Sequence, residues 1–458
     1  MPVINPRVFR EYDIRGLVDV DLDPESVGLI GKAYGTYLRR RGLTDVVVGR
    51  DNRPSSELYR NAIVRGLLET GCNVADIGLV VTPIFYFARV RYGIEGGVMI
   101  TGSHNPPEYN GFKLGAGPAT MYGEQIQEIR RIAESGRFEK GRGSVREVDP
   151  AEEYVATIVK SVGLGPRPVT VVVDCGNGSG GLFGPRILEL LGCRVIPLFC
   201  EPDGNFPNHF PDPVKPENLR LLSEAVRDHR ADVGVAYDGD ADRLGAVDEM
   251  GRPVFGDVLM ALFWREILPR HPGAAALVEV KCSQALVDEI RRLGGRPMFW
   301  RTGHSLIKAK MREIGAVFTG EMSGHMFFAD EYYGYDDAIY ASARLMRILS
   351  NSGSRLSEMV ADLPTYYSTP ETRVECPDDA KFAIVDEITR YFKSRYDVVD
   401  IDGVRVMFPE GWGLVRASNT QPALVLRAEA SDAESLEVIK RRIREKLSEY
   451  PAVGEVAW

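Results

Sequence analysis

The stretch "DVVVGRDNRPSSELYRNAIVRGLLETGCNVADIG", residues 45–78, contains one complete structural unit. An apolar, β-rich run leads into a polar turn, an amphipathic helix and then a second strand. The same order recurs in "VTVVVDCGNGSGGLFGPRILELLGCRVIPLF", residues 169–199, and in "AALVEVKCSQALVDEIRRLGGRPMFW", residues 275–300. The pattern therefore predicts three similar α/β domains with mixed sheets. Each helix ends at a glycine, which a left-handed cap favours: Gly71, Gly192 and Gly294.

The pattern changes after "LPTYYSTPET", where strands and helices no longer alternate. A strand, a helix, further strands and a last helix predict a smaller C-terminal α+β domain. We expect the four domains to surround a central cleft, because sites in such arrays form where loops from several domains meet. The expected domain boundaries are 1–148, 149–251, 252–364 and 365–458.

The composition of the chain argues against some classes of binding partner. A net charge of −9 offers no basic field for nucleic acid or an anionic membrane. The N-terminus lacks a long apolar region, and no stretch of about 18 apolar residues occurs. The six cysteines are scattered without CxxC pairs, which argues against a disulfide framework or a structural zinc site. We expect a cytoplasmic protein that acts on small molecules, with neither nucleic acid nor membrane as partner.

The motif "TGSHNPPEYNGFK", residues 101–113, follows the apolar run "GGVMI". The run reads as a buried strand, so Ser103, His104 and Asn105 stand together at its end. The two prolines that follow fix the backbone and remove amide donors. We expect a stiff, exposed loop that presents Ser103.

The strongest chemical signal is "VGVAYDGDADR", residues 233–243. Val233 to Tyr237 predict a strand, and an extended backbone beyond it would point Asp238, Asp240 and Asp242 the same way. Three convergent carboxylates repel each other unless a divalent cation lies between them, and oxygen ligands favour Mg²⁺. An alternative is a phosphatase in which Asp238 is the nucleophile. An EF-hand is disfavoured, because Arg243 stands where that loop needs glycine.

Two further motifs offer groups for a sugar phosphate. In "GLVRASNTQPALVLRAEA" an arginine, two hydroxyls and turn amides lie between two predicted strands and suit a phosphate. In "GEMSGHMFF" a carboxylate, a hydroxyl and an imidazole alternate beside glycines and suit sugar hydroxyls. Taken alone, either motif is also compatible with a plain turn. The residues concerned are Arg416, Ser418, Asn419 and Thr420, and Glu321, Ser323 and His325.

Taken in order, "TGSHNP", "DGDADR", "GEMSGH" and "RASNT" resemble the α-D-phosphohexomutase superfamily, and within it the bacterial phosphomannomutase/phosphoglucomutase family. The resemblance runs from "FREYDIRG" to the C-terminal domain. It implies three related α/β domains and a smaller α+β domain around one deep cleft. It also implies hexose phosphates as substrates, Mg²⁺ as cofactor, glucose 1,6-bisphosphate or its mannose equivalent as activator, and a monomer or weak homodimer.

The resemblance assigns a role to each motif and its domain: "TGSHNP" is the phosphoserine loop of 1–148, "DGDADR" the metal loop of 149–251, "GEMSGH" the sugar-recognition loop of 252–364 and "RASNT" the phosphate loop of 365–458. Ser103 would be the phosphoserine and, with Asp238, Asp240 and Asp242, would contact the metal ion. It implies electrostatic or acid–base help to the transferring group from Arg15, Lys113, Arg243, His104, His304 and His325. Substrate contacts are expected from Tyr12, Lys281, Glu321, Ser323, Arg416, Ser418, Asn419 and Thr420.

The implied reaction interconverts hexose 1-phosphates and 6-phosphates of mannose and glucose. A 1,6-bisphosphate would form, turn round within the cleft and return its other phosphate to Ser103. Phosphoglucosamine mutase remains a near alternative. An aspartate-nucleophile sugar phosphatase and a non-catalytic sugar-phosphate sensor are alternatives from other classes.

Overall fold

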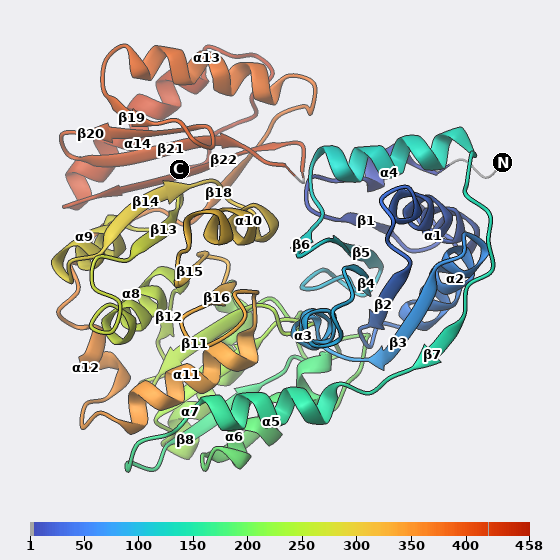
Figure 1. Cartoon of the computed structure of the whole chain (residues 1–458). Helices are drawn as coiled ribbons and strands as arrows, with labels where there is room; N and C mark the ends of the chain where they lie inside the picture. The colour runs from blue at the N-terminus through green and yellow to red at the C-terminus, as the bar shows by residue number, and fades with distance from the viewer. Residues whose placement is uncertain (1–3, 420) are drawn as a thin grey trace.

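In the computed structural model, which describes residues 4–419 and 421–458, four domains meet at a common junction (Figure 1). The first domain lies at the right of the view in blue to teal. The second, third and fourth domains rise on the left from green through yellow to red. Three α/β domains with mixed sheets are followed by an antiparallel α+β domain, so the predicted fold class is confirmed.

The first domain has a seven-stranded sheet in the order β1-β5-β4-β2-β3-β7, with β6 paired to β5. Strands β2, β3 and β4 run parallel, whereas β5 is antiparallel to both β4 and β1. The end of β4 delivers the Ser103 loop. The elements are β1 (Ile14–Leu17), α1 (Pro24–Arg39), β2 (Asp45–Arg50), α2 (Ser56–Glu69), β3 (Asn73–Leu79), α3 (Thr82–Tyr92), β4 (Gly96–Ile100), β5 (Tyr109–Ala116), β6 (Ala119–Thr120), α4 (Glu124–Ser135) and β7 (Val145–Glu147).

The second domain has the strand order β12-β11-β10-β8-β9. Strand β10 is parallel to β8 and antiparallel to β11, so the turn between β10 and β11 lies at the carboxyl end of β10. That turn carries the three aspartates. The elements are α5 (Ala151–Ser161), β8 (Thr170–Asp174), α6 (Gly184–Leu190), β9 (Arg194–Leu198), α7 (Arg220–His229), β10 (Val233–Tyr237), β11 (Leu244–Asp248) and β12 (Pro253–Val254).

The third domain pairs β13 with β14 in parallel and β15 with β16 in an antiparallel hairpin. The Thr319 hydroxyl on β15 donates to the Leu277 carbonyl oxygen on β13 at 2.9 Å and joins the two pairs. The elements are α8 (Gly256–Ile267), β13 (Ala275–Glu279), α9 (Gln284–Arg292), β14 (Arg296–Trp300), α10 (His304–Ile314), β15 (Phe318–Gly320), β16 (Met326–Phe328), α11 (Ala338–Ser350) and α12 (Leu356–Val360).

The fourth domain is an antiparallel sheet in the order β17-β22-β21-β20-β19, with β18 also paired to β22. The loop between β21 and β22 carries the "RASNT" motif. The elements are β17 (Tyr367–Ser368), β18 (Thr372–Glu375), α13 (Lys381–Lys393), β19 (Asp397–Val399), β20 (Val404–Phe408), β21 (Gly411–Ala417), β22 (Ala423–Ala430) and α14 (Ala433–Leu447).

The hydrophobic cores show how firmly the domains are joined. One continuous core runs through the second and third domains and includes α3 of the first, whereas most of the first domain and the fourth have cores of their own. The predicted left-handed glycines are confirmed, with φ of 83° at Gly71, 102° at Gly192 and 81° at Gly294. None of the described helices is long and apolar enough to cross a membrane.

Candidate active site at the domain junction

Ser103 lies in the loop after β4 with its side chain against the second domain. Its hydroxyl donates to Asp238 Oδ2 at 2.6 Å. We expected this serine on an exposed loop, but it is only 2% exposed. The second domain covers it so closely that a Cβ atom at Gly239 would lie 2.5 Å from the Ser103 carbonyl oxygen. Ser103 also has φ of +50°, a left-handed conformation that a non-glycine residue adopts only when its surroundings impose it.

Arg53 holds the Ser103 loop in place, and the sequence motifs gave no indication of this role. Its guanidinium donates to the carbonyl oxygens of Ser103 at 2.8 Å, Asn105 at 2.6 Å and Pro106 at 2.6 Å. The Asp51 carboxylate, 3.2 Å from Arg53 Nε, balances the buried charge. The only available signal was a charged pair within the polar turn of the first repeated unit.

The three aspartates converge through a turn. We expected an extended backbone beyond β10, but the strand ends at Tyr237 and Ala241 adopts φ of +57°. Asp238 Oδ1 accepts the backbone N–H of Asp242 at 3.0 Å, which closes the turn. One oxygen from each of Asp238, Asp240 and Asp242 lies within 4.8 Å of the others. Burial, and after it the two neighbouring negative charges, raise the pKa of Asp238 well above its usual value.

Lys113, on β5 of the first domain, reaches into this cluster. Its ammonium group donates to Asp240 Oδ2 at 2.7 Å and also to Asp242 Oδ2. Burial alone would lower the pKa of Lys113, but the charges of the two carboxylates raise it well above the usual value. Thr82 donates its hydroxyl to Asp240 Oδ2 at 2.6 Å. The first domain thus supplies both a cation and a hydroxyl to the acidic turn of the second.

The donor set fits a divalent cation. Asp240 Oδ1 and Asp242 Oδ1 are buried and accept no hydrogen bond from any described residue, so each has an oxygen free for a further partner. A buried carboxylate oxygen without a partner is costly, and hard cations prefer such oxygens. The cluster is therefore consistent with a metal site.

Two histidines from the third domain face the metal loop. Arg243 Nε donates to His325 Nε2 at 3.1 Å, and His325 Nδ1 lies 3.1 Å from Asp336 Oδ2. The His304 ring stacks on that of His325, with centroids 5.4 Å apart. Burial, and after it the charge of Lys308, lower the pKa of His304 well below its usual value. The imidazole of His304 is therefore neutral at pH 7.

His104 and Arg15 flank Ser103 from the first domain. His104 Nδ1 lies 3.1 Å from Ser103 Oγ, and burial, followed by the charges of nearby arginines, lowers the pKa of this imidazole well below its usual value. Arg15 donates to Asn105 Oδ1 at 2.7 Å and to Asp13 Oδ2 at 2.6 Å. Arg15 thus braces the loop around the serine.

Lys308 and Asp336 form an ion pair behind the histidines, and no motif indicated it. Lys308 Nζ donates to Asp336 Oδ1 at 2.7 Å and to the Tyr86 hydroxyl, on α3, at 2.9 Å. Asp336 is completely buried. This contact joins the third domain to the first directly behind His325.

The "GEMSGH" loop places its two predicted sugar-binding side chains together. Glu321 Oε1 accepts the backbone N–H of Gly303 at 2.7 Å, and the Ser323 hydroxyl donates to Glu321 Oε2 at 3.0 Å. Burial raises the pKa of Glu321. The Glu321 carboxylate thus joins the Ser323 hydroxyl to the backbone at Gly303.

Lys281 connects the third and fourth domains. Its ammonium group lies 3.2 Å from Glu279 Oε1 and donates to Glu371 Oε2 at 2.9 Å. Lys281 is 7% exposed. Its charge is thus shared between two carboxylates at the edge of the junction.

The fourth domain contributes side chains to the site through β21 and the loop that follows it. Arg416 donates through Nε to Asp402 Oδ2 at 2.9 Å. Asn419 Nδ2 donates to the Tyr12 phenol oxygen at 2.6 Å, and Tyr12 donates in turn to the Thr302 carbonyl oxygen at 2.8 Å. Residues of the first, third and fourth domains therefore meet at Tyr12.

The remaining residues of the phosphate loop follow β21. Ser418 is buried, and its hydroxyl accepts the backbone N–H of Gln421 at 3.1 Å. Thr420, also predicted as a phosphate contact, lies outside the described residues. The described part of the loop is thus a tight turn that faces Tyr12.

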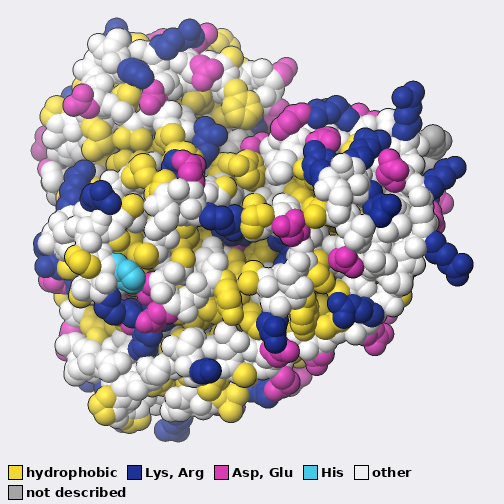
Figure 2. Space-filling model, in the orientation of Figure 1, with side chains coloured by type: hydrophobic (Ala, Val, Ile, Leu, Met, Phe, Trp, Pro, Cys, Tyr) yellow, Lys and Arg dark blue, Asp and Glu magenta, His cyan; other side chains and the backbone are white. Residues whose placement is uncertain are grey.

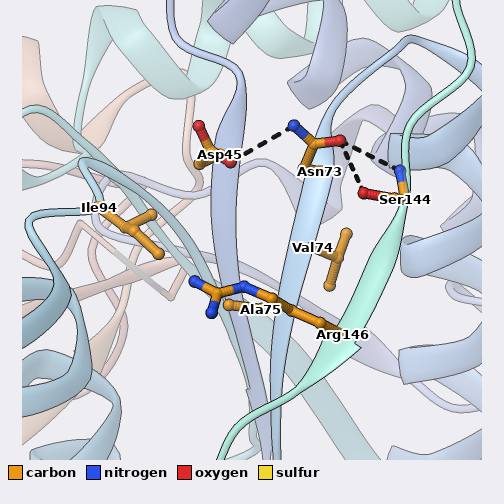
Figure 3. A pocket seen from close by; sticks show the side chains of 7 residues that line it. All are labelled: Asp45, Asn73, Val74, Ala75, Ile94, Ser144 and Arg146. Carbon is orange, nitrogen blue, oxygen red and sulfur yellow. Dashed lines mark hydrogen bonds between the residues drawn. The ribbon is translucent and has the colours of Figure 1, made fainter.

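Two cavities lie away from these motifs. One of about 150 Å³ lies at the edge of the first sheet, where Asn73 bonds to Asp45 and Ser144 (Figure 3). Another of about 280 Å³ lies between the first and third domains beside Arg89 and Arg312. A notch at the top of Figure 2 separates the first domain from the fourth, and basic and hydrophobic side chains lie side by side along the junction. The predicted site residues meet at this junction and not at either cavity.

The fold and the ordered motifs define a class, the four-domain phosphohexomutases. Comparison with known families places the chain more closely. Four families described as phosphoglucomutase/phosphomannomutase match it in order: alpha/beta/alpha domain I over residues 6–140, alpha/beta/alpha domain II over 152–251, alpha/beta/alpha domain III over 255–367 and the C-terminal domain over 371–446. The chain belongs to the phosphoglucomutase/phosphomannomutase family.

Relatives match over nearly the whole length. A phosphomannomutase/phosphoglucomutase of Pseudomonas aeruginosa is 46% identical over 447 residues, covering 97% of this chain and 96% of the relative. A phosphoglucomutase of Neisseria gonorrhoeae is 43% identical over 456 residues, covering 98% and 99%. The crystal structure of a family protein from Burkholderia thailandensis superposes with a TM-score of 0.91 at 41% identity and covers 98% of each chain. The predicted resemblance, and with it the assignment to the hexose phosphate mutases, which are isomerases, are confirmed.

Proposed function

We propose that this protein reversibly converts mannose 1-phosphate and glucose 1-phosphate into the corresponding 6-phosphates, with Ser103 as the residue that carries the phosphoryl group. The observation that carries the proposal is the 2.6 Å hydrogen bond from Ser103 Oγ to Asp238 Oδ2 across two domains. A buried hydroxyl fixed on a carboxylate cluster suits phosphoryl transfer, which needs positioning and neutralisation of charge more than covalent chemistry. The names of the relatives support both sugars.

Asp238, Asp240 and Asp242, with an oxygen of phosphorylated Ser103, would hold one Mg²⁺. When bound, this cation neutralises negative charge on the phosphoryl group during transfer. Lys113 and Arg243 add positive charge on either side of the carboxylates. In the first half-reaction a sugar hydroxyl oxygen bonds to phosphorus, the bond from phosphorus to Ser103 Oγ breaks, and a buried imidazole takes the hydroxyl proton. In the second, Ser103 Oγ bonds to the other phosphorus of the bisphosphate, the bond from that phosphorus to the sugar oxygen breaks, and a buried imidazolium gives the proton to the sugar oxygen.

The histidines are in the right state for that proton transfer. The lowered pKa values of His104 and His304 leave their rings neutral at pH 7, the form that accepts a proton. His325 is oriented through Nδ1 by Asp336 and faces Arg243 through Nε2. An anionic substrate that draws Arg243 away would free His325 Nε2 for a sugar hydroxyl.

Two loops would hold the rest of the substrate. Arg416, Ser418 and Asn419 bind the phosphate that is not reacting, and Thr420 joins them in the predicted motif. Glu321 and Ser323 hold the hydroxyls that look alike in both orientations, those at O3 and O4. Tyr12 and Lys281 complete the lining of the substrate site. Because the phosphate loop belongs to the fourth domain and the reacting serine to the first, a 1,6-bisphosphate would have to turn round to present its second phosphate to Ser103.

The test is phosphorus NMR of the protein with Mg²⁺ and a trace of glucose 1,6-bisphosphate, the expected activator. Mannose 1-phosphate, glucose 1-phosphate and glucosamine 1-phosphate are supplied in separate samples. We expect 6-phosphate signals to grow with the first two sugars and to stay small with the third. Preference for the amino sugar would identify a phosphoglucosamine mutase instead.

Release of inorganic phosphate would contradict the proposal in a different way. It would favour Asp238 as nucleophile, and Ser103→Ala would then retain activity. Binding of sugar phosphates without turnover would identify a sensor. We further propose a cytoplasmic enzyme that acts as a monomer or weak homodimer, a setting that the acidic net charge of −9 and the small substrates support.

A further inference from the structure

Two cysteines of the second domain lie in contact. The sulfur atoms of Cys175 and Cys200 are 3.3 Å apart, although 25 residues separate them in sequence. Strands β8 and β9 run parallel with Asp174 opposite Leu198, so the residues just beyond their carboxyl ends meet at the same sheet edge. The contact is therefore a consequence of strand register.

The two thiols differ in access and in acidity. All six cysteines lie in the described part of the chain, and five are buried while Cys200 is partly exposed. Burial raises the pKa of Cys175 well above its usual value. Once Cys200 has lost its proton, the Cys175 thiol can donate to it, and this hydrogen bond lowers the pKa of Cys200. Because the thiolate is the nucleophile, Cys200 is the sulfur that meets an oxidant first.

We propose that Cys175 and Cys200 are a modification site, at which a peroxide forms a reversible disulfide that lowers the activity of the enzyme. The Cys200 thiolate attacks one peroxide oxygen, the O–O bond breaks, and Cys200 becomes a sulfenic acid as hydroxide leaves and takes up a proton. Cys175 then attacks the sulfenic sulfur, and a second water leaves. Two thiols and one hydrogen peroxide thus give one disulfide and two waters.

A disulfide here would disturb the metal loop. The two sulfurs must approach from 3.3 Å to about 2.05 Å. The loop after Cys175 packs on the aspartate turn, because Ser179 N donates to the Gly239 carbonyl oxygen at 3.0 Å. A Cβ atom at Gly178 would lie 2.8 Å from that same oxygen, so the two loops have no space between them.

The first domain contacts the same loop. Asn52 Nδ2 donates to the Asn177 carbonyl oxygen at 2.8 Å, and the Ser179 hydroxyl donates to Asn52 Oδ1 at 3.2 Å. A shift after Cys175 therefore reaches both the aspartate turn and the interface that positions Ser103. Displacements of about 1 Å at a reacting centre reduce rates by up to about a hundredfold.

The experiment treats the full-length enzyme with hydrogen peroxide, then with dithiothreitol. Peptide mass spectrometry counts disulfides and sulfenic acids, and the mutase assay follows activity. Cys200→Ser removes the attacking sulfur and Cys175→Ser the resolving one. Cys193→Ser is the matched control, because Cys193 belongs to the same domain but is buried. Circular dichroism establishes that each variant is folded.

Peroxide should link Cys175 to Cys200 in the wild-type enzyme and in Cys193→Ser, and should lower the rate of both by about tenfold or more. Dithiothreitol should reverse the linkage and restore the rate. Cys175→Ser should instead leave a sulfenic acid on Cys200, which dimedone traps, and Cys200→Ser should keep its activity in peroxide. No Cys175–Cys200 linkage in the folded wild-type enzyme overturns the modification site. Linkage without a change in rate overturns its effect on activity.

The effect on activity rests on the proposed function, but the linkage does not. The mass measurement needs no substrate, and the rate before peroxide tests the mutase assignment by itself. An enzyme that forms the linkage but has no mutase activity before treatment would contradict the proposed function and leave the disulfide standing.

Discussion

The Tyr12 phenol oxygen accepts a hydrogen bond from Asn419 Nδ2 at 2.6 Å, and so connects the first domain to the fourth. The same hydroxyl donates to the Thr302 carbonyl oxygen in the third domain at 2.8 Å. One buried tyrosine therefore bridges three domains at the edge of the site. We expect its hydroxyl to contribute to the position of the phosphate loop and hence to substrate affinity.

Replacing Tyr12 with phenylalanine removes both hydrogen bonds and keeps the ring. At about 1 kcal/mol for each bond, KM for glucose 1-phosphate should rise by about thirtyfold, with a smaller change in kcat. Steady-state kinetics measure both constants. Tyr37→Phe, within the first domain, is the control and should leave KM unchanged. An unchanged KM in Tyr12→Phe would separate this tyrosine from substrate binding.

Replacing Ser103 with alanine removes the proposed phosphoryl carrier. Mutase activity should fall by about 10⁴-fold or more, since loss of an attacking residue typically costs that much. The unfolding free energy should change by only about 1–2 kcal/mol, because the hydrogen bonds of the hydroxyl with Asp238 and His104 are lost. Ser135→Ala, on α4, serves as the control. Retained activity in Ser103→Ala would instead support a nucleophilic aspartate.

Lys113→Met tests the balance of charge in the acidic turn. Lys113 is 3% exposed, and its removal leaves two buried carboxylates without their cation. In a chelator the variant should lose about 3–5 kcal/mol of unfolding free energy, and saturating Mg²⁺ should restore much of it. Thermal unfolding with and without Mg²⁺ measures the difference. Lys310→Met is the control, because the ion-pair partner of Lys310 is the exposed Glu313. Equal losses in the chelator and in Mg²⁺ would argue against a cation at this turn.

The contact between Lys281 and Glu371 predicts a pH dependence. The charge of Lys281, the largest cause, lowers the pKa of Glu371 to about 2. A carboxyl whose folded-state pKa is depressed stabilises the fold fully above its unfolded pKa, here about 4.5, and loses that effect as pH falls toward the folded value. Between pH 6 and pH 3.5 the wild-type enzyme should lose about 1 kcal/mol relative to Glu371→Gln.

Urea unfolding at each pH measures this difference. Glu358→Gln, on α12 of the third domain, provides the comparison for loss of a carboxylate elsewhere. A Glu371→Gln variant whose stability follows the wild-type curve at every pH would show that the contact between the domains contributes nothing.

Much of the fold could be predicted because each repeated unit carries its own local signals. The apolar strands, the amphipathic helices and the glycines at Gly71, Gly192 and Gly294 all act over a few residues. The order of strands depends instead on contacts far apart in sequence. That β1 lies beside β5, or that β7 joins the first sheet beyond β3, has no local signature.

The candidate site was predictable where several polar or charged residues lie within one short motif. The supporting residues were not, because each acts across a domain boundary or a long loop. Arg53 reaches the Ser103 loop from the end of β2, and Lys308 reaches Asp336 and Tyr86 in different elements. The burial of Ser103 was missed for the same reason, since the cover comes from Gly239 of the next domain.

The meeting of Tyr12 with Asn419 also bears on how the enzyme is made. Translation produces Ser103 and the three aspartates well before Asn419 leaves the ribosome. The first two domains can be synthesised while the phosphate loop of the fourth domain is still missing. At that stage the second domain already covers Ser103, but the phosphate loop is missing, so we expect a sugar phosphate to be held only after the fourth domain has docked. The fourth domain thus completes a site whose serine belongs to the first.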